Sequence, residues 1–259
     1  MSVAQLRQEH IAFQSNLYDS ANPTRRWLHN TRRDWVMRAL ERIAPPQPVY
    51  LEIGIGCGIY TRAMAKQGPV FALDINPAFV DAANQLPNVV AQVSDITKTA
   101  LAPVHDVALC SEVLEHLPTD LSLNALRNMY ASIKPGGHLV LTTPNSWSSM
   151  EAFARLLSFK PAVQLARAIY GESVDDLGHT NRLTRQALMA QIQAAGFSIV
   201  EQNDLALYLP VIAEFGGARG LAFAKSLEHR LRAMPVMSQL LWTQCYILRR
   251  PDGQGVVNA

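Results

Sequence analysis

A glycine-rich segment near the start of the chain limits the fold more than any other feature. Residues 51–58 read Leu-Glu-Ile-Gly-Ile-Gly-Cys-Gly and directly follow the apolar pair Val49-Tyr50. Glycine adopts positive φ angles and lets a ligand approach the main chain, because it has no Cβ atom. A helix that starts after such a turn directs free N–H groups at the ligand. The segment therefore predicts a strand, a tight turn at a ligand and a helix.

Two acidic residues indicate which ligand this turn receives. Asp74 ends the next apolar run, about 20 residues after the glycines, where doubly wound α/β domains place a carboxylate on ribose hydroxyls. Glu52 precedes the glycines, whose spacing Gly-x-Gly-x-Gly differs from the dinucleotide fingerprint Gly-x-Gly-x-x-Gly. A carboxylate at this place repels a pyrophosphate and attracts a cationic group. The ammonium and sulfonium of S-adenosylmethionine meet that requirement.

Short apolar runs alternate with amphipathic segments through the middle of the chain. The runs that predict strands lie near residues 48–53, 69–74, 89–93, 105–110 and 138–143. The segments that predict helices are 59–67, 77–84 and 121–132. This alternation is typical of a parallel sheet with helices on both faces, a doubly wound α/β fold. Pro135-Gly136-Gly137 predicts a turn before the fifth strand.

The second half of the chain completes this sheet. A helix at 184–195, a strand at 197–203 and a last strand at 241–248 are expected. The result is a seven-stranded, mostly parallel, Rossmann-like sheet within a single domain, residues 1–259.

Three further segments are expected to cover the sheet. Residues 1–46 form an N-terminal helical cover that Asn22-Pro23 interrupts. Residues 146–183 and 205–240 are helical insertions, and we expect them to form a cap over the substrate.

Five segments in order resemble a known family. They are Leu51–Gly58, Leu73–Asn76, Ser94–Ile96, Asp106–His116 and Ile133–Val140. With them the chain resembles the class I S-adenosylmethionine-dependent methyltransferases. Through Ser111–His116 it is similar to the small-molecule branch that includes the ubiquinone-biosynthesis O-methyltransferases. The resemblance implies an enzyme of class EC 2.1.1 with S-adenosylmethionine as its cofactor.

The resemblance also implies a role for each matched position. Glu52, Gly54, Gly56 and Gly58 hold the methionine portion of the cofactor. Asp74 holds the ribose, and Ile75 packs on the adenine. Asp95 and Ile96 meet the adenine amino group and ring face, and Cys110, Ser111 and Glu112 border the reacting methyl. In related enzymes the N-terminal helix closes over the cofactor, which makes Tyr18 and His29 cleft candidates; ordinary aromatic packing explains them equally well.

An oxygen acceptor must lose a proton, and histidine is the usual base near neutral pH. His116 follows the fourth predicted strand, and His179 lies between the first insertion and the next helix. We consider both as catalytic candidates, with a structural turn as the alternative for His116. Glu112, Glu115 and His116 are compact enough for a divalent metal, but a cluster at a helix start explains them better, and we expect no metal.

The composition of the chain limits which partners and which cellular location we expect. The formal net charge is only +2, and basic residues occur as short pairs, so a nucleic-acid partner is not expected. Three cysteines without metal spacing suggest reduced thiols in a cytoplasmic protein. The N-terminal residues lack the apolar core of a signal peptide. Nothing in the sequence indicates the oligomeric state.

The apolar insertions suggest the acceptor. Their Phe, Leu, Ile and Met residues predict a pocket for a small, largely apolar or lipid-like molecule, methylated on oxygen. Helices near 149–170 and 217–233 also mix Arg and Lys with Leu and Phe, which leaves peripheral membrane contact open beside plain core packing. N- or C-methylation of a small molecule and a catalytically silent, cofactor-binding partner subunit are the alternatives.

Overall fold

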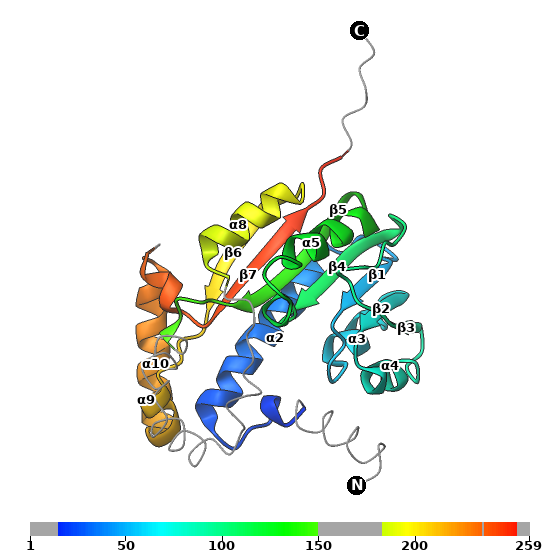
Figure 1. Cartoon of the computed structure of the whole chain (residues 1–259). Helices are drawn as coiled ribbons and strands as arrows, with labels where there is room; N and C mark the ends of the chain where they lie inside the picture. The colour runs from blue at the N-terminus through cyan, green and yellow to red at the C-terminus, as the bar shows by residue number, and fades with distance from the viewer. Residues whose placement is uncertain (1–14, 150–182, 235, 253–259) are drawn as a thin grey trace.

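The computed structural model describes residues 15–149, 183–234 and 236–252. They contain a seven-stranded sheet in the order β3-β2-β1-β4-β5-β7-β6. The strands are β1 (Tyr50–Ile53), β2 (Val70–Asp74), β3 (Val89–Val93), β4 (His105–Ser111), β5 (Ile133–Pro144), β6 (Ser198–Leu205) and β7 (Thr243–Arg249). Only β7 runs antiparallel to its neighbours within this sheet (Figure 1). The predicted doubly wound, mostly parallel sheet is confirmed.

Helices cover both faces of the sheet because alternate strand residues point to opposite sides. The first core cluster joins residues such as Tyr50 and Leu109 to α2 (Pro23–Ile43), α3 (Ile59–Met64) and α4 (Pro77–Ala83). The second joins residues such as Leu51 and Leu141 to α5 (Ser122–Ser132) and α8 (Arg185–Ala194). Every strand except β3 therefore contributes to two cores, one on each face; β3 packs only on the first, through Val89 and Ala91.

The fifth strand differs from the prediction. β5 begins at Ile133, so Pro135-Gly136-Gly137 lies inside it and does not form a turn before it. The pairing of β4 with β5 shifts register between His105 and Val107, and Gly136 has φ of +80°. These residues form a bulge, in which extra residues of one strand face fewer residues of its partner.

Helices also lie before the sheet and, in the chain, between its last two strands. The helix α2 belongs to the predicted N-terminal cover. The elements α9 (Pro210–Phe215), α10 (Gly217–Arg232) and η3 (Met237–Leu240) lie between β6 and β7, where the second insertion was expected. Most of the first insertion, 146–183, lies outside the described residues. No helix in the described ranges is both long and apolar enough to cross a bilayer.

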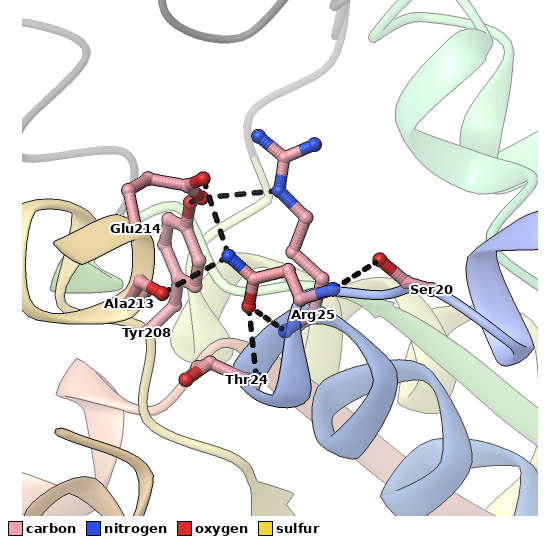
Figure 2. Close-up of polar contacts among 7 residues, drawn as sticks. Ser20, Thr24, Arg25, Tyr208, Ala213 and Glu214 are labelled. Atoms are coloured by element: carbon pink, nitrogen blue, oxygen red, sulfur yellow. Dashed lines mark hydrogen bonds and ion pairs between the residues drawn. The ribbon is translucent and has the colours of Figure 1, made fainter. Parts of the chain in front are cut away.

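A polar cluster fastens the start of α2 to α9 (Figure 2). Asn22 caps α2, because its Oδ1 accepts two N–H groups of the first turn at 2.9 and 3.1 Å. The Asn22 amide also donates to Glu214 of α9 at 3.2 Å. Arg25 and Tyr208 donate to the other oxygen of Glu214, at 3.0 and 2.7 Å. The position of α2 over the sheet is thus coupled to the second insertion.

Candidate cofactor and acceptor site

The glycine segment forms the expected tight turn after β1. Gly54, Gly56 and Gly58 all have positive φ, at +80°, +53° and +71°. A Cβ atom built on Gly54 would lie 2.4 Å from Cγ2 of Val113, which follows β4. The turn therefore packs main chain against the segment after β4, and only glycine allows this approach.

Asp74 lies at the carboxyl end of β2 and binds the glycine turn. Its Oδ2 accepts the N–H groups of Ile55 at 2.7 Å and Gly56 at 3.3 Å, and its Oδ1 accepts the N–H of Asn76 at 2.8 Å. A carboxylate accepts about four hydrogen bonds, so these three leave capacity for a ligand hydroxyl. The geometry fits the ribose role implied for Asp74.

Glu52 is fully buried directly before the glycine turn. Its Oε2 accepts a hydrogen bond from Thr61 at 2.5 Å, whereas its Oε1 has no partner. Burial raises the pKa of Glu52 to about 8; the Thr61 hydrogen bond opposes this rise and nearby Asp74 adds to it. A buried carboxyl oxygen without a partner is costly, and a cationic ligand group would satisfy it. This buried carboxyl group fits the cationic methionine end of S-adenosylmethionine.

The residues expected around the adenine differ in exposure. Ile75 follows β2 with 75% of its surface exposed, so its side chain is open to a ligand ring. Ile96 is 4% exposed and packs in the second core cluster. Asp95 accepts the N–H and hydroxyl of Thr97 at 2.9 and 2.7 Å. Ile75 therefore offers an open apolar surface to the adenine. Asp95 keeps a partly exposed carboxylate.

The end of β4 brings together the residues expected near the methyl group. The Cys110 side chain is fully buried in the second core cluster, so only its main chain is available to a ligand. The hydroxyls of Ser111 and Thr142 lie 2.9 Å apart, and Thr142 donates to Glu112 at 2.9 Å. Glu112 has φ of +57°, an uncommon angle for a residue with a side chain.

Arg32 of α2 joins this group, and sequence reasoning missed it. Its guanidinium binds the Glu112 carboxylate at 2.7 Å, and both side chains are largely buried. It also lies 5.2 Å from the centre of the Trp242 ring. Burial alone would lower the pKa of Arg32, but Glu112 raises it above the ordinary value. Nothing in the sequence around Arg32 distinguishes it from the solvated arginines of the same helix.

The two N-terminal candidates lie beside this arginine. The His29 ring makes edge contacts with Tyr18 and Trp242, with ring centres 6.0 and 5.3 Å away. Burial, and then the charge of Arg32, lower the pKa of His29 to about 3. His29 is therefore a neutral imidazole at pH 7. The phenol oxygen of Tyr60, on α3, is buried without a hydrogen-bond partner.

The acidic segment after β4 forms the short helix η1 (Leu114–His116). Glu115 is buried and accepts a hydrogen bond from Thr143 at 3.0 Å. Burial, and then the nearby Glu112, raise the pKa of Glu115 well above its ordinary value. His116 is exposed on this helix, and His179 lies outside the described residues. Within the described ranges, no group of three or more His, Cys, Asp or Glu side chains is arranged to hold a metal.

A family model for the methyltransferase domain matches residues 24–202. This chain belongs to the methyltransferase domain family. S-adenosylmethionine is the methyl donor of this family, and the turn, Glu52 and Asp74 described above are the residues that fit it. The matched range includes α2, with Arg32, and the strands β1 to β5.

Relatives agree with this assignment over part of the chain. A ubiquinone biosynthesis O-methyltransferase of Vibrio vulnificus is 34% identical over 104 residues, which is 37% of this chain and 43% of the relative. This chain thus matches less than half the length of that relative.

Solved structures extend the likeness of fold. The N-methyltransferase NodS from Bradyrhizobium japonicum, in complex with S-adenosyl-L-homocysteine, has a TM-score of 0.59 at 16% identity, covering 96% of this chain and 98% of its own. The [4+2]-cyclase SpnF has a TM-score of 0.54 at 14% identity, covering 85% of this chain and 81% of its own. At these identities the likeness shows the fold alone.

Proposed function

We propose that this methyltransferase domain transfers the methyl group of S-adenosylmethionine to an oxygen atom of a small, largely apolar or lipid-like acceptor. One observation carries the proposal: the ends of β1, β2 and β4 bring the glycine turn, Glu52, Asp74 and Ser111–Glu112 to one edge of the sheet. Ligands of open α/β sheets bind at this edge. The O-methyltransferase name of the Vibrio relative supports oxygen as the acceptor atom.

When bound, the cofactor supplies a methyl group already activated on a sulfonium. The chain therefore needs to bind the cofactor, orient the acceptor and remove the acceptor proton. It does not need to activate the methyl group. Glu52 and the glycine turn hold the methionine end, Asp74 holds the ribose, and Ile75 covers the adenine. Holding two reactants in line lowers a barrier by about 7–11 kcal/mol in favourable systems. Arg32 and Glu112 fix the wall next to the acceptor by joining α2 to the end of β4.

We propose a histidine as the base that takes the acceptor proton. His116 follows β4 directly on η1, and His179 precedes α8 in the chain. Neutral His29 is also near Arg32, but its lowered pKa makes it a weak base. His116 and His179 therefore remain the two candidates.

The remaining parts of the proposal concern partners and location. A small-molecule acceptor without nucleic acid follows from the low net charge. A cytoplasmic location is supported by the three cysteines, which are buried free thiols. Residues 146–183 and 205–240 act in this proposal as the cap that selects the acceptor.

A two-stage experiment tests the proposal. Calorimetry measures binding of S-adenosylhomocysteine to the wild type and to Asp74→Asn, which we expect to bind at least about tenfold more weakly. Turnover is then measured with phenolic, fatty and sugar-linked acceptors for wild type, His116→Asn, His179→Asn and the control His229→Asn, an exposed residue of α10. We expect one of the first two variants to lose turnover about a hundredfold or more while keeping cofactor affinity.

Each contrary result has a definite meaning. Cofactor binding without turnover of any acceptor would favour the silent partner subunit. Methylation of amines alone, or of carbon acceptors alone, would replace O-methylation with the alternative chemistry. Activity on protein or RNA alone would refute a small-molecule acceptor. Equal activity in all three histidine variants would refute the histidine base.

A further inference from the structure

A hollow lies away from the cofactor edge, between α2, β6 and the end of α10. Its volume is about 440 Å³, within the range of small-molecule sites. β6 is the edge strand four places from β1 in the sheet. At about 4.8 Å per strand, roughly 19 Å separate the two strands. None of the residues that line this hollow, which we call the arginine groove, belongs to the site described above.

Three arginines line the arginine groove. Arg38 and Arg42 belong to α2, and Arg232 is the last residue of α10. Thr31, Trp35, Arg38 and Arg42 recur every three or four positions, so they form one stripe along α2. Two segments far apart in the sequence thus direct positive charge into one hollow.

The carboxylates near the arginine groove do not balance this charge. Arg42 pairs with Glu201 of β6, and Arg232 pairs with Glu228 of α10. Arg38 has no ion pair or hydrogen bond with any residue of the described ranges. Glu201 also accepts a hydrogen bond from the Asn203 amide at 2.6 Å. The groove keeps one uncompensated positive charge.

The arginines also keep many unused donors. A guanidinium has five N–H groups, and the ion pairs of Arg42 and Arg232 each use one nitrogen. Thr31 and Trp35 complete the wall that α2 supplies. A phosphate group has several oxygens and a negative charge, so it accepts from several guanidiniums at once.

We propose that the arginine groove binds a phosphate group, held by Arg38, Arg42 and Arg232 between α2, β6 and α10. The site is separate from the cofactor edge and goes beyond the methyl-transfer proposal. A ligand there would connect the N-terminal helix to the second insertion, because α10 packs against α2. The phosphate would belong to a free small molecule or to a lipid headgroup.

Calorimetry with inorganic pyrophosphate tests the site directly. The protein is first saturated with S-adenosylhomocysteine, so that the cofactor edge does not contribute. We expect one pyrophosphate per chain, with affinity reduced at least about tenfold in the double variant Arg38→Gln/Arg232→Gln. Arg230→Gln is the matched control, because Arg230 is an exposed arginine of the same helix that does not line the groove. Thermal unfolding checks that all variants fold.

Flotation with phosphatidylglycerol–phosphatidylcholine vesicles separates the two phosphate sources. Pyrophosphate binding that the double variant loses supports a free phosphate compound. Vesicle binding that the double variant loses, without pyrophosphate binding, supports a headgroup. The proposal is refuted if neither probe binds, if the double variant binds as the wild type does, or if Arg230→Gln weakens binding equally. None of these readouts depends on methyl transfer.

Discussion

At Glu52, burial and an unpaired oxygen act on the same carboxyl group. Its pKa is about 8 in the folded chain against 4.5 in the unfolded chain, so the folded state binds the extra proton between these values. The contribution of Glu52 to stability must then fall as the pH rises from about 4.5 to about 8.

Glu52→Gln removes this titration and tests it. We expect the variant to gain stability relative to the wild type as the pH rises through that window, by a few kcal/mol in total, with no relative gain below it. Urea unfolding at pH 4.5, 6 and 8 without cofactor measures the difference. Glu41→Gln, an exposed position on α2, is the control and should stay within about 0.5 kcal/mol of the wild type. A difference independent of pH would contradict the raised pKa.

At Arg32 the question is the cost of leaving Glu112 without its counter-charge. Arg32→Met keeps much of the packing and removes the guanidinium from a largely buried pair. We expect unfolding free energy to drop by about 3 kcal/mol, the lower end of the range for a broken buried pair, because Glu112 stays partly exposed. Arg33→Met breaks an exposed pair with the neighbouring Asp34 and should cost at most about 1 kcal/mol. Equal losses in chemical unfolding would show that burial does not distinguish the two pairs.

At the scale of elements, the decisive contact joins α2 to α9. Glu214 accepts from Asn22, Arg25 and Tyr208, so one carboxylate fastens the N-terminal helix to the second insertion (Figure 2). Since α2 carries Arg32 and His29, this fastening also positions one wall of the candidate site.

Glu214→Gln tests the fastening, because the amide presents one acceptor oxygen where the carboxylate has two. We expect a loss of about 1–2 kcal/mol of stability and faster hydrogen exchange in α9 and in the first turn of α2. The second half of α2, which packs on the sheet, is the internal control and should keep its protection. Unchanged exchange in the first turn would show that the helix cap alone holds it.

At the scale of the whole molecule, two cores on opposite faces of one sheet stabilise the fold. Leu126 of α5 is fully buried in the second core, whereas Leu123 of the same helix is only partly buried. We expect Leu126→Ala to lower the unfolding free energy by about 2–5 kcal/mol and Leu123→Ala to lower it by less. Urea unfolding measures both losses of free energy, provided that the free energy falls with urea concentration at the same slope in the variants and the wild type. A larger loss at Leu123 would mean that α5 packs with another face.

The sequence determined the elements and the place of the cofactor site. Each strand repeats a local pattern of apolar residues bounded by turn residues, so β1 to β4 could be located almost to the residue. The glycine turn, Glu52 and Asp74 follow directly from those strands, and parallel strands bring their carboxyl ends to one edge. At Pro135–Gly137 local turn propensity misled, because pairing with β4 absorbed those residues as a bulge inside β5.

Only the tertiary structure decided which distant side chains meet. Arg32 and Glu112 lie in different elements, and the three arginines of the groove come from α2 and α10. In the sequence Glu112 is a candidate site residue, but all four arginines look like surface charges. Periodicity reports which face of a helix is apolar, but not which strand end or neighbouring helix a polar side chain will reach. That choice depends on how α2 packs across the sheet, a long-range property that only the folded chain has.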